Sequence, residues 1–160
     1  IIFLCLLVGS SIGVFCLQAR WGLQGEYYPN PNWEGKPTIA RRDHIPYLKG
    51  ETGYNLLSTN VFSVKWSGWI AINQSGIYKF TTISDDGSYL RIDGKLVVDN
   101  GGAHGLKRIS QEIALKEGAH SIEILYFQLG GFSFMQVLWT PPGKSEKPIS
   151  AEVLFSKYPG

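Results

Sequence analysis

The segment 77–100, IYKFTTISDDGSYLRIDGKLVVDN, decides the fold of this chain. It contains three apolar runs rich in β-forming residues, at 77–83, 88–92 and 95–98. Asp93-Gly94 separates the second run from the third. This pair is typical of a two-residue hairpin turn, because glycine adopts positive φ without steric cost and aspartate tolerates it. The segment therefore predicts three short antiparallel strands, the last two joined as a hairpin.

Asp85 and Asp86 occupy the turn between the first two runs. Successive side chains on extended backbone point to opposite faces, so two neighbouring carboxylates normally diverge. Holding them together costs Coulomb repulsion unless a cation or hydrogen-bond donors lie between them. These two aspartates are therefore the first candidates for a functional site.

Further strand patterns lie on both sides of this segment. Phe62, Val64 and Trp66 alternate with polar residues, as do the apolar residues of 122–126, which is typical of half-buried strands. Residues 150–155 predict a short helical turn that packs Leu154 and Phe155 on the body, and no other stretch after residue 20 has helical periodicity. Short strands at regular spacing predict an all-β, antiparallel β-sandwich.

The central motif, SDDGSYLRIDGKLVVDNGGAH, resembles the core motif of the anthrax protective-antigen domain family, a β-sandwich module. The resemblance covers 22–155. The other matching pieces, in chain order, are GLQGEYYPNPNWEGKP, FSVKWSGWIAINQSGIYKF, EGAHSIEILYF and VLWTPPG.

This resemblance implies a role for the acidic pair. In the sugar-binding relatives a cis peptide joins the matching aspartates, and both face one calcium ion that also binds sugar hydroxyls. Calcium prefers several oxygen ligands in flexible geometry. The alternative is an Asp-rich turn whose side chains cap loop amides, since relatives without lectin activity keep the pair.

The later loop that supplies another oxygen, commonly from Asn, in the lectin relatives reads QLGGF at 128–132 here, without Asp or Asn. The expected calcium ligands are therefore Asp85, Asp86 and Gln128. Asp99 and Asn100 are further candidates if their loop folds over the site. Trp33, from an aromatic-rich opening loop, and His104 complete the expected ligand-binding set. Aromatic residues in such a loop are more often core or lid residues than sugar-stacking ones.

The run 1–17, IIFLCLLVGSSIGVFCL, carries no charge. A helix of this length spans about 25 Å, slightly less than the ~30 Å hydrocarbon core of a bilayer. A cleaved signal peptide and a retained anchor both fit this pattern; we expect an anchor helix at 1–20 and a β-sandwich at 21–160 outside the cytoplasm. Gly9 and Gly13 would share one helix face and admit a neighbouring helix, although small residues are common in membrane helices generally.

Composition excludes several function classes. A net charge of +2 gives little field to attract phosphate, so we expect no nucleic-acid partner. Both cysteines, Cys5 and Cys16, lie in the apolar run, which leaves the rest of the chain without thiolate ligands. No catalytic motif such as GxSxG or HExxH occurs.

Two non-catalytic functions follow. The first is an accessory subunit whose helix docks in a membrane-protein assembly while the sandwich packs on neighbouring proteins. The second is a membrane-tethered, calcium-dependent carbohydrate-binding module.

Overall fold

The computed structural model describes residues 21–50 and 52–158. The expected anchor helix at 1–20, with Gly9 and Gly13, lies outside these residues. Within them, no helix combines the length and the apolar character that crossing a membrane requires.

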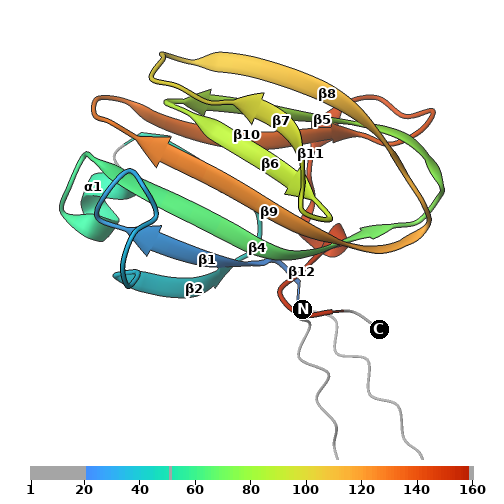
Figure 1. Ribbon diagram of the computed structural model, residues 1–160, viewed down its shortest axis with the longest axis horizontal. Coiled ribbons are helices and arrows are strands. Elements are labelled where there is room, and N and C mark those ends of the chain that lie inside the picture. The colour runs from blue at the N-terminus through green and yellow to red at the C-terminus, as the bar shows by residue number, and fades with distance from the viewer. Residues whose placement is uncertain (1–20, 51, 159–160) are drawn as a thin grey trace, which may run out of the picture.

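The described strands form two antiparallel sheets, one of seven strands and one of five (Figure 1). The larger sheet has the spatial order β2 (Ile39–Asp43), β1 (Leu23–Tyr28), β4 (Phe62–Ile72), β9 (Gly118–Gln128), β6 (Ser88–Ile92), β7 (Lys95–Asn100), with β12 (Leu154–Phe155) paired to β4. The smaller sheet has the order β11 (Lys147–Pro148), β10 (Ser133–Thr140), β5 (Gly76–Asp85), β8 (Lys107–Leu115), with β3 (Tyr47–Gly50) paired to β10.

The predicted three-strand segment is confirmed as β5, β6 and β7. The β6–β7 hairpin closes with Ile92 opposite Lys95, and Asp93 and Gly94 have φ values of 50° and 75°. Both values are those of a type I′ turn, whose twist matches that of the flanking strands. The acidic turn lies where the chain leaves β5 in the smaller sheet and enters β6 in the larger one.

The hydrophobic core fills the space between the two sheets. Alternate residues of β9, including Ile122, Ile124 and Tyr126, are buried, while the residues between them face outward. The largest fully buried side chains include Trp66 and Phe80, one from each sheet. Every buried hydrophobic side chain in the described residues lies between Leu23 and Leu154, so this segment contains its own core.

Two helical elements accompany the sheets. The predicted turn near the C-terminus is confirmed as a 3-10 helix, η1 (Ala151–Val153), after which Leu154 is fully buried in β12. The six-residue helix α1 (Thr52–Leu57) was not expected and corrects the prediction that no other helix follows residue 20. It is too short to display a helical hydrophobic period.

The two ends of the described chain meet beside β4. Trp21 forms an antiparallel bridge with Phe155, and the Gly22 amide donates to the Leu154 carbonyl at 2.7 Å. Trp21 and the last described residues therefore lie on the same side of the body (Figure 1).

Candidate functional site

The acidic turn has an unusual backbone. The peptide bond between Asp85 and Asp86 is cis, as the family resemblance implied. A Cβ on the next residue, Gly87, would lie 2.3 Å from the Phe127 ring, so only glycine fits there. The Gly87 carbonyl accepts the Phe127 amide at 3.0 Å, which fastens the turn to the end of β9.

Asp86 connects three loops. Its side chain is 8% exposed. Oδ1 accepts the His104 backbone N–H and Oδ2 accepts the Leu129 backbone N–H, each at 2.9 Å. These bonds join the β5–β6 turn to the β7–β8 and β9–β10 loops. Each carboxylate oxygen keeps one further lone pair for another donor or a cation.

The Gln128 side chain holds the same turn in place through hydrogen bonds. Its side chain is fully buried. The amide oxygen lies 3.0 Å from the Asp86 backbone N–H and 2.7 Å from the Tyr126 hydroxyl, and Nε2 donates to the carbonyls of Gly130 and Phe132. Both sides of the amide are thus engaged within the protein, and a metal contact at Oε1 would have to replace one of these bonds.

Asp85 differs from Asp86. The structure gives its carboxylate no hydrogen-bond or ion-pair partner within the described part of the chain. Burial, followed by the negative charge of Asp86, raises the pKa of the Asp85 carboxyl, while His104 acts in the opposite direction. Burial and the charge of Asp85 likewise raise the pKa of the Tyr126 hydroxyl, which lies 2.6 Å from the Asp85 carbonyl and stays protonated. Asp85 is therefore the carboxylate available to an external ligand.

The loop after β7 folds onto the turn, since the His104 amide donates to Asp86. This is the condition under which Asp99 and Asn100 are candidate ligands. The ring nitrogens of His104 lie 2.8 Å from the Gly105 carbonyl and 3.0 Å from the Asn100 carbonyl, which holds the loop closed. The exposed Asp99 accepts the Gly101 amide at 3.1 Å. The Asn100 side chain is buried and donates to the Ser84 hydroxyl at 3.1 Å.

The Asn100 amide also leaves an acceptor unused. Its Oδ1 is buried and has no hydrogen-bond partner among the described residues. Asp85 and the remaining lone pairs of Asp86 supply carboxylate oxygens, which fit a hard cation such as calcium. No group of three His, Cys, Asp or Glu side chains in residues 21–50 and 52–158 could hold a metal, so other ligands would be carbonyls, water or sugar hydroxyls.

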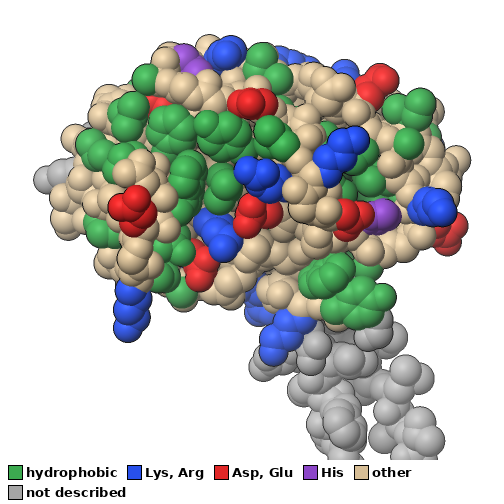
Figure 2. Space-filling model, in the orientation of Figure 1, with side chains coloured by type: hydrophobic (Ala, Val, Ile, Leu, Met, Phe, Trp, Pro, Cys, Tyr) green, Lys and Arg blue, Asp and Glu red, His purple; other side chains and the backbone are tan. Residues whose placement is uncertain are grey.

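Trp33 belongs to an aromatic cluster beside the turn. Its indole N–H donates to the Val64 carbonyl at 3.0 Å, and its ring packs edge-on against Phe127 and Tyr89 at centroid distances of 5.9 and 6.5 Å. All three rings are half-buried on the outer face of the larger sheet. Figure 2 shows hydrophobic side chains gathered on the left of this face, over the ends of β9 and β6.

The structure thus gathers Asp86, Gln128 and His104 around one turn with Asp85, and places Asn100 and Trp33 next to it. Asp99 is not brought into the site, because its side chain is exposed and bonds to Gly101 of its own loop. Sequence reasoning did not identify Tyr126, Phe127 and Tyr89, which lie on β9 and β6 within hydrogen-bonding or packing reach of the site. Their only sequence signal is alternation. The Tyr126 side chain points into the core, whereas the side chains of Phe127 and Tyr89 point to the outer face of the sheet.

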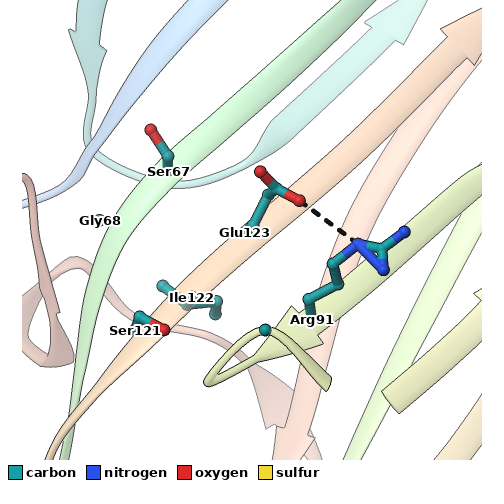
Figure 3. Close-up of a pocket in the computed structure, with 7 residues that line it drawn as sticks. Ser67, Gly68, Arg91, Ser121, Ile122 and Glu123 are labelled. Atoms are coloured by element: carbon teal, nitrogen blue, oxygen red, sulfur yellow. Dashed lines mark ion pairs between the residues drawn. The ribbon is translucent and has the colours of Figure 1, made fainter. Parts of the chain in front are cut away.

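A separate groove of about 260 Å³ lies at the other end of β6 and β9 (Figure 3). Arg91 on β6 and Glu123 on β9 face each other across it, with Nε and Oε1 3.4 Å apart. None of the candidate site residues lines this groove.

Comparisons with known proteins place this geometry in context. The anti-sigma-I factor RsgI3 of Acetivibrio thermocellus is 27% identical over 136 residues, which is 84% of this chain and 21% of that protein. The solved structure of an anti-sigma factor domain-containing protein matches with a TM-score of 0.78 and 25% identity, over 85% of this chain and 48% of that one. The chain therefore spans about a fifth of the curated relative and about half of the solved chain.

A second solved structure, a PA14 sugar-binding domain from an RTX adhesin, matches with a TM-score of 0.70 and 21% identity over 86% of this chain and 99% of that one. It shows the same fold in a structure made up of this domain. The family model of the PA14 domain matches residues 19–152. The resemblance to the protective-antigen family is confirmed, and the chain belongs to the PA14 domain family.

Proposed function

We propose that this chain is the non-catalytic, extracytoplasmic carbohydrate-binding module of a membrane-anchored regulatory protein of the anti-sigma-factor type. The observation that carries the proposal is the unpartnered, half-buried carboxylate of Asp85 at the rim of the sandwich. Its neighbour Asp86 is held in place by the two loops that donate to its carboxylate. The relatives named anti-sigma factors and the sugar-binding PA14 domain of an adhesin support the two halves of the proposal.

The residues divide into three roles at this site. Asp85 and Asp86 would hold a calcium ion, and a bound calcium ion supplies a centre that accepts sugar hydroxyl oxygens. Gln128 and His104 keep the loops in place through their bonds to Asp86 and to neighbouring carbonyls. Trp33, in the aromatic cluster beside the turn, offers an apolar surface to a sugar ring.

In this proposal the uncharged run 1–17 is the anchor that connects the module to the rest of the regulatory protein. Other parts of that protein would then respond to the binding of a polysaccharide outside the cell. The module itself performs no chemistry.

Calorimetry of the isolated domain, 21–160, with calcium and then with a panel of glycans tests the proposal. We expect calcium binding at millimolar concentration or below, and glycan binding that a chelator removes. Asp85→Asn keeps the shape of the side chain but removes its charge, and should abolish both. Glu112→Gln, an exposed change on β8, is the matched control and should change neither. Absence of calcium binding in the wild-type domain would eliminate the proposed site.

A second function, the accessory subunit that docks on other proteins, is favoured by a different observation. Leu129 and Phe132, in the loop after β9, are 46% and 52% exposed. Large apolar side chains grouped on one rim are typical of protein contacts. Purification of the membrane-inserted protein in mild detergent should then recover a stoichiometric partner, and Leu129→Ser with Phe132→Ser should release it. A protein that purifies alone would contradict this function.

A further inference from the structure

A cavity of about 450 Å³ lies at the opposite end of the smaller sheet from the acidic turn. β5 begins at Gly76 beside this cavity and ends at Asp85, a strand length of about 30 Å. The cavity is large enough for a small ligand. The residues that define its chemistry are Asn73, Gln74, Tyr78, Trp139, Lys144 and Lys147.

Two aromatic rings form the buried part of the lining. Tyr78 and Trp139 are stacked, with centroids 5.8 Å apart, and both are more than nine-tenths buried. The Tyr78 hydroxyl donates to the Gln74 carbonyl at 2.9 Å. The indole N–H of Trp139, in contrast, is buried and has no acceptor in the described part of the chain. This burial closes the N–H to solvent, so Trp139 contributes the surface of its ring to the cavity rather than a hydrogen-bond donor.

The loop that carries Lys144 is held in a defined shape. The Lys144 amide donates to the Pro141 carbonyl at 3.0 Å, and Gly143 has a φ of 68°, as in a type II turn with Pro142 at its second position. The ring of Pro142 covers Gly76, where a Cβ would lie 2.6 Å from its Cγ. This wall of the cavity is therefore fixed before any ligand binds.

Glu146 fastens the same loop to the outer face of the smaller sheet. Its carboxylate lies 3.4 Å from Lys79 Nζ, accepts the Thr81 hydroxyl at 2.9 Å and pairs with Arg108. The next residue, Lys147, is paired in register with Trp139 on the neighbouring strand. Residues directly opposite on antiparallel strands point to the same face, so Lys147 lies on the same face of the sheet as Trp139.

The charges of the lining identify the kind of ligand. Lys144 and Lys147 are exposed, and neither forms an ion pair within the described residues. Glu152, also on the lining, is the one carboxylate there, which leaves a net positive rim. Two ammonium groups favour an anionic group, while the side-chain amides and Glu152 match hydroxyl groups. Pro141 and Pro142 offer apolar surface.

We infer that this cavity is a second binding site, separate from the acidic turn, for a sugar that carries an anionic group. The anion, a carboxylate or a phosphate, pairs with the two lysines. The side-chain amides of Asn73 and Gln74 and the Glu152 carboxylate pair with sugar hydroxyls, beside the stacked rings of Tyr78 and Trp139. The site does not depend on calcium, because its charged groups at the rim are mainly cations.

The indole N–H signals in a ¹H–¹⁵N spectrum of the domain, 21–160, test this inference directly. The domain contains its own core, and a PA14 domain of this extent has been solved as a separate chain. The five tryptophans give five signals, and Trp139→Phe identifies the relevant one. On titration with glucuronate and with glucose 6-phosphate to about 50 mM, enough to detect a millimolar Kd, we expect the Trp139 signal to shift and saturate while that of Trp33 stays in place.

Charge variants supply the second readout. Lys144→Gln and Lys147→Gln should each weaken binding about two- to fivefold, because each removes one exposed cation. Lys95→Gln, on the β6–β7 turn, is the matched control and should have no effect. The titration should be unchanged by a chelator and by Asp85→Asn, so failure of the acidic-turn site and failure of this one are distinguishable.

The probes also separate the possible sources. A shift with glucuronate only identifies a carboxylate-bearing sugar, and a shift with glucose 6-phosphate only identifies a phosphate-bearing one; either supports the inference. Equal affinity for neutral glucose would overturn the anionic requirement. Equal affinity for sulfate would reduce the cavity to a simple anion site, and no shift of the Trp139 signal with any probe would overturn the inference entirely.

Discussion

At the scale of single residues, the acidic turn depends on Gln128. This buried amide meets the Asp86 amide and the Tyr126 hydroxyl on one side and two loop carbonyls on the other. A carboxylate could accept the first two bonds but could not donate to the carbonyls. An apolar side chain could neither accept nor donate. The identity of this residue is therefore explained by the hydrogen bonds it makes to the protein itself.

Gln128→Leu should destabilise the domain by about 2–4 kcal/mol, because it leaves several buried polar groups without partners. Urea unfolding measures the loss. Gln111→Leu, an exposed change on β8, is the matched control and should stay within about 0.5 kcal/mol of wild type. A loss below about 1 kcal/mol for Gln128→Leu would mean that water replaces the amide.

His120 makes stability depend on pH at the far end of the larger sheet. Its Nδ1 lies 2.6 Å from Asp93 Oδ2, and Nε2 lies 2.8 Å from the Lys116 carbonyl. Burial opposes the charged ring, but the bond to Asp93, the bond to Lys116 and the charge of Asp93 together raise its pKa above the ordinary value. The stabilisation is therefore fully present below the unfolded-state pKa of about 6.5 and is lost as pH rises through the higher folded-state value.

Asp93→Asn should remove this dependence. The difference in unfolding free energy between wild type and Asp93→Asn should be largest below about pH 6 and shrink above it, with a total below about 1 kcal/mol because Asp93 is half-exposed. Urea unfolding at a series of pH values measures it. His44→Asn, at an exposed position, should keep the wild-type pH dependence. A difference that grows with pH would contradict the assignment.

At the scale of elements, the β10–β11 connection is held mainly by side chains rather than by a long ladder. β11 contributes two residues, and Ile149 adds one amide bond to the Val137 carbonyl at 3.1 Å. Glu146, within the connection, contacts Lys79, Thr81 and Arg108 on β5 and β8. A two-residue strand thus owes its position to a carboxylate on the preceding loop.

Glu146→Gln should therefore loosen this connection without unfolding the sheets. We expect amide hydrogen exchange at Ile149 to accelerate roughly three- to tenfold, while amides in the centre of β9 keep their wild-type protection. Glu117→Gln, in the β8–β9 turn, is the control. Acceleration of the whole smaller sheet would indicate that Glu146 supports the fold as a whole rather than the one connection.

At the scale of the whole molecule, sequence patterns predicted which segments form strands better than they predicted which strands pair with each other. Alternation revealed β4 and β9, and the Asp93-Gly94 pair fixed a hairpin, because both signals are local. The pairing of β1 with β4, or of β3 with β10, joins segments far apart in the chain, and no local pattern encodes it. The helix α1 was missed because six residues are too few for a period.

The site could be predicted in part for the same reason. Asp85 and Asp86 are adjacent in sequence, and the family motif identified them. The contact of Asp86 with His104 and Leu129, and the engagement of both ends of the Gln128 amide, depend on three loops meeting in space. Adjacent acids can be read from a sequence, whereas the donors that hold them cannot.

Calcium should stabilise the whole domain if the acidic turn binds it. At about ten times its Kd it adds roughly 1.4 kcal/mol, which raises Tm by about 3 °C for a domain of this size. A thermal melt measures the shift. Asp85→Asn should abolish it, and magnesium at the same concentration should give less, since it requires a more regular ligand shell. The same rise in Asp85→Asn would place the ion elsewhere.

The bridge between Trp21 and Phe155 has a mechanical consequence. The two ends of the described chain are joined at this bridge, so they lie at one point of the sandwich. Tension applied between Trp21 and Phe155 would load the bridge between them first, before the hydrophobic core or the rim with the paired aspartates. The rim would therefore keep its shape while the two ends are pulled apart.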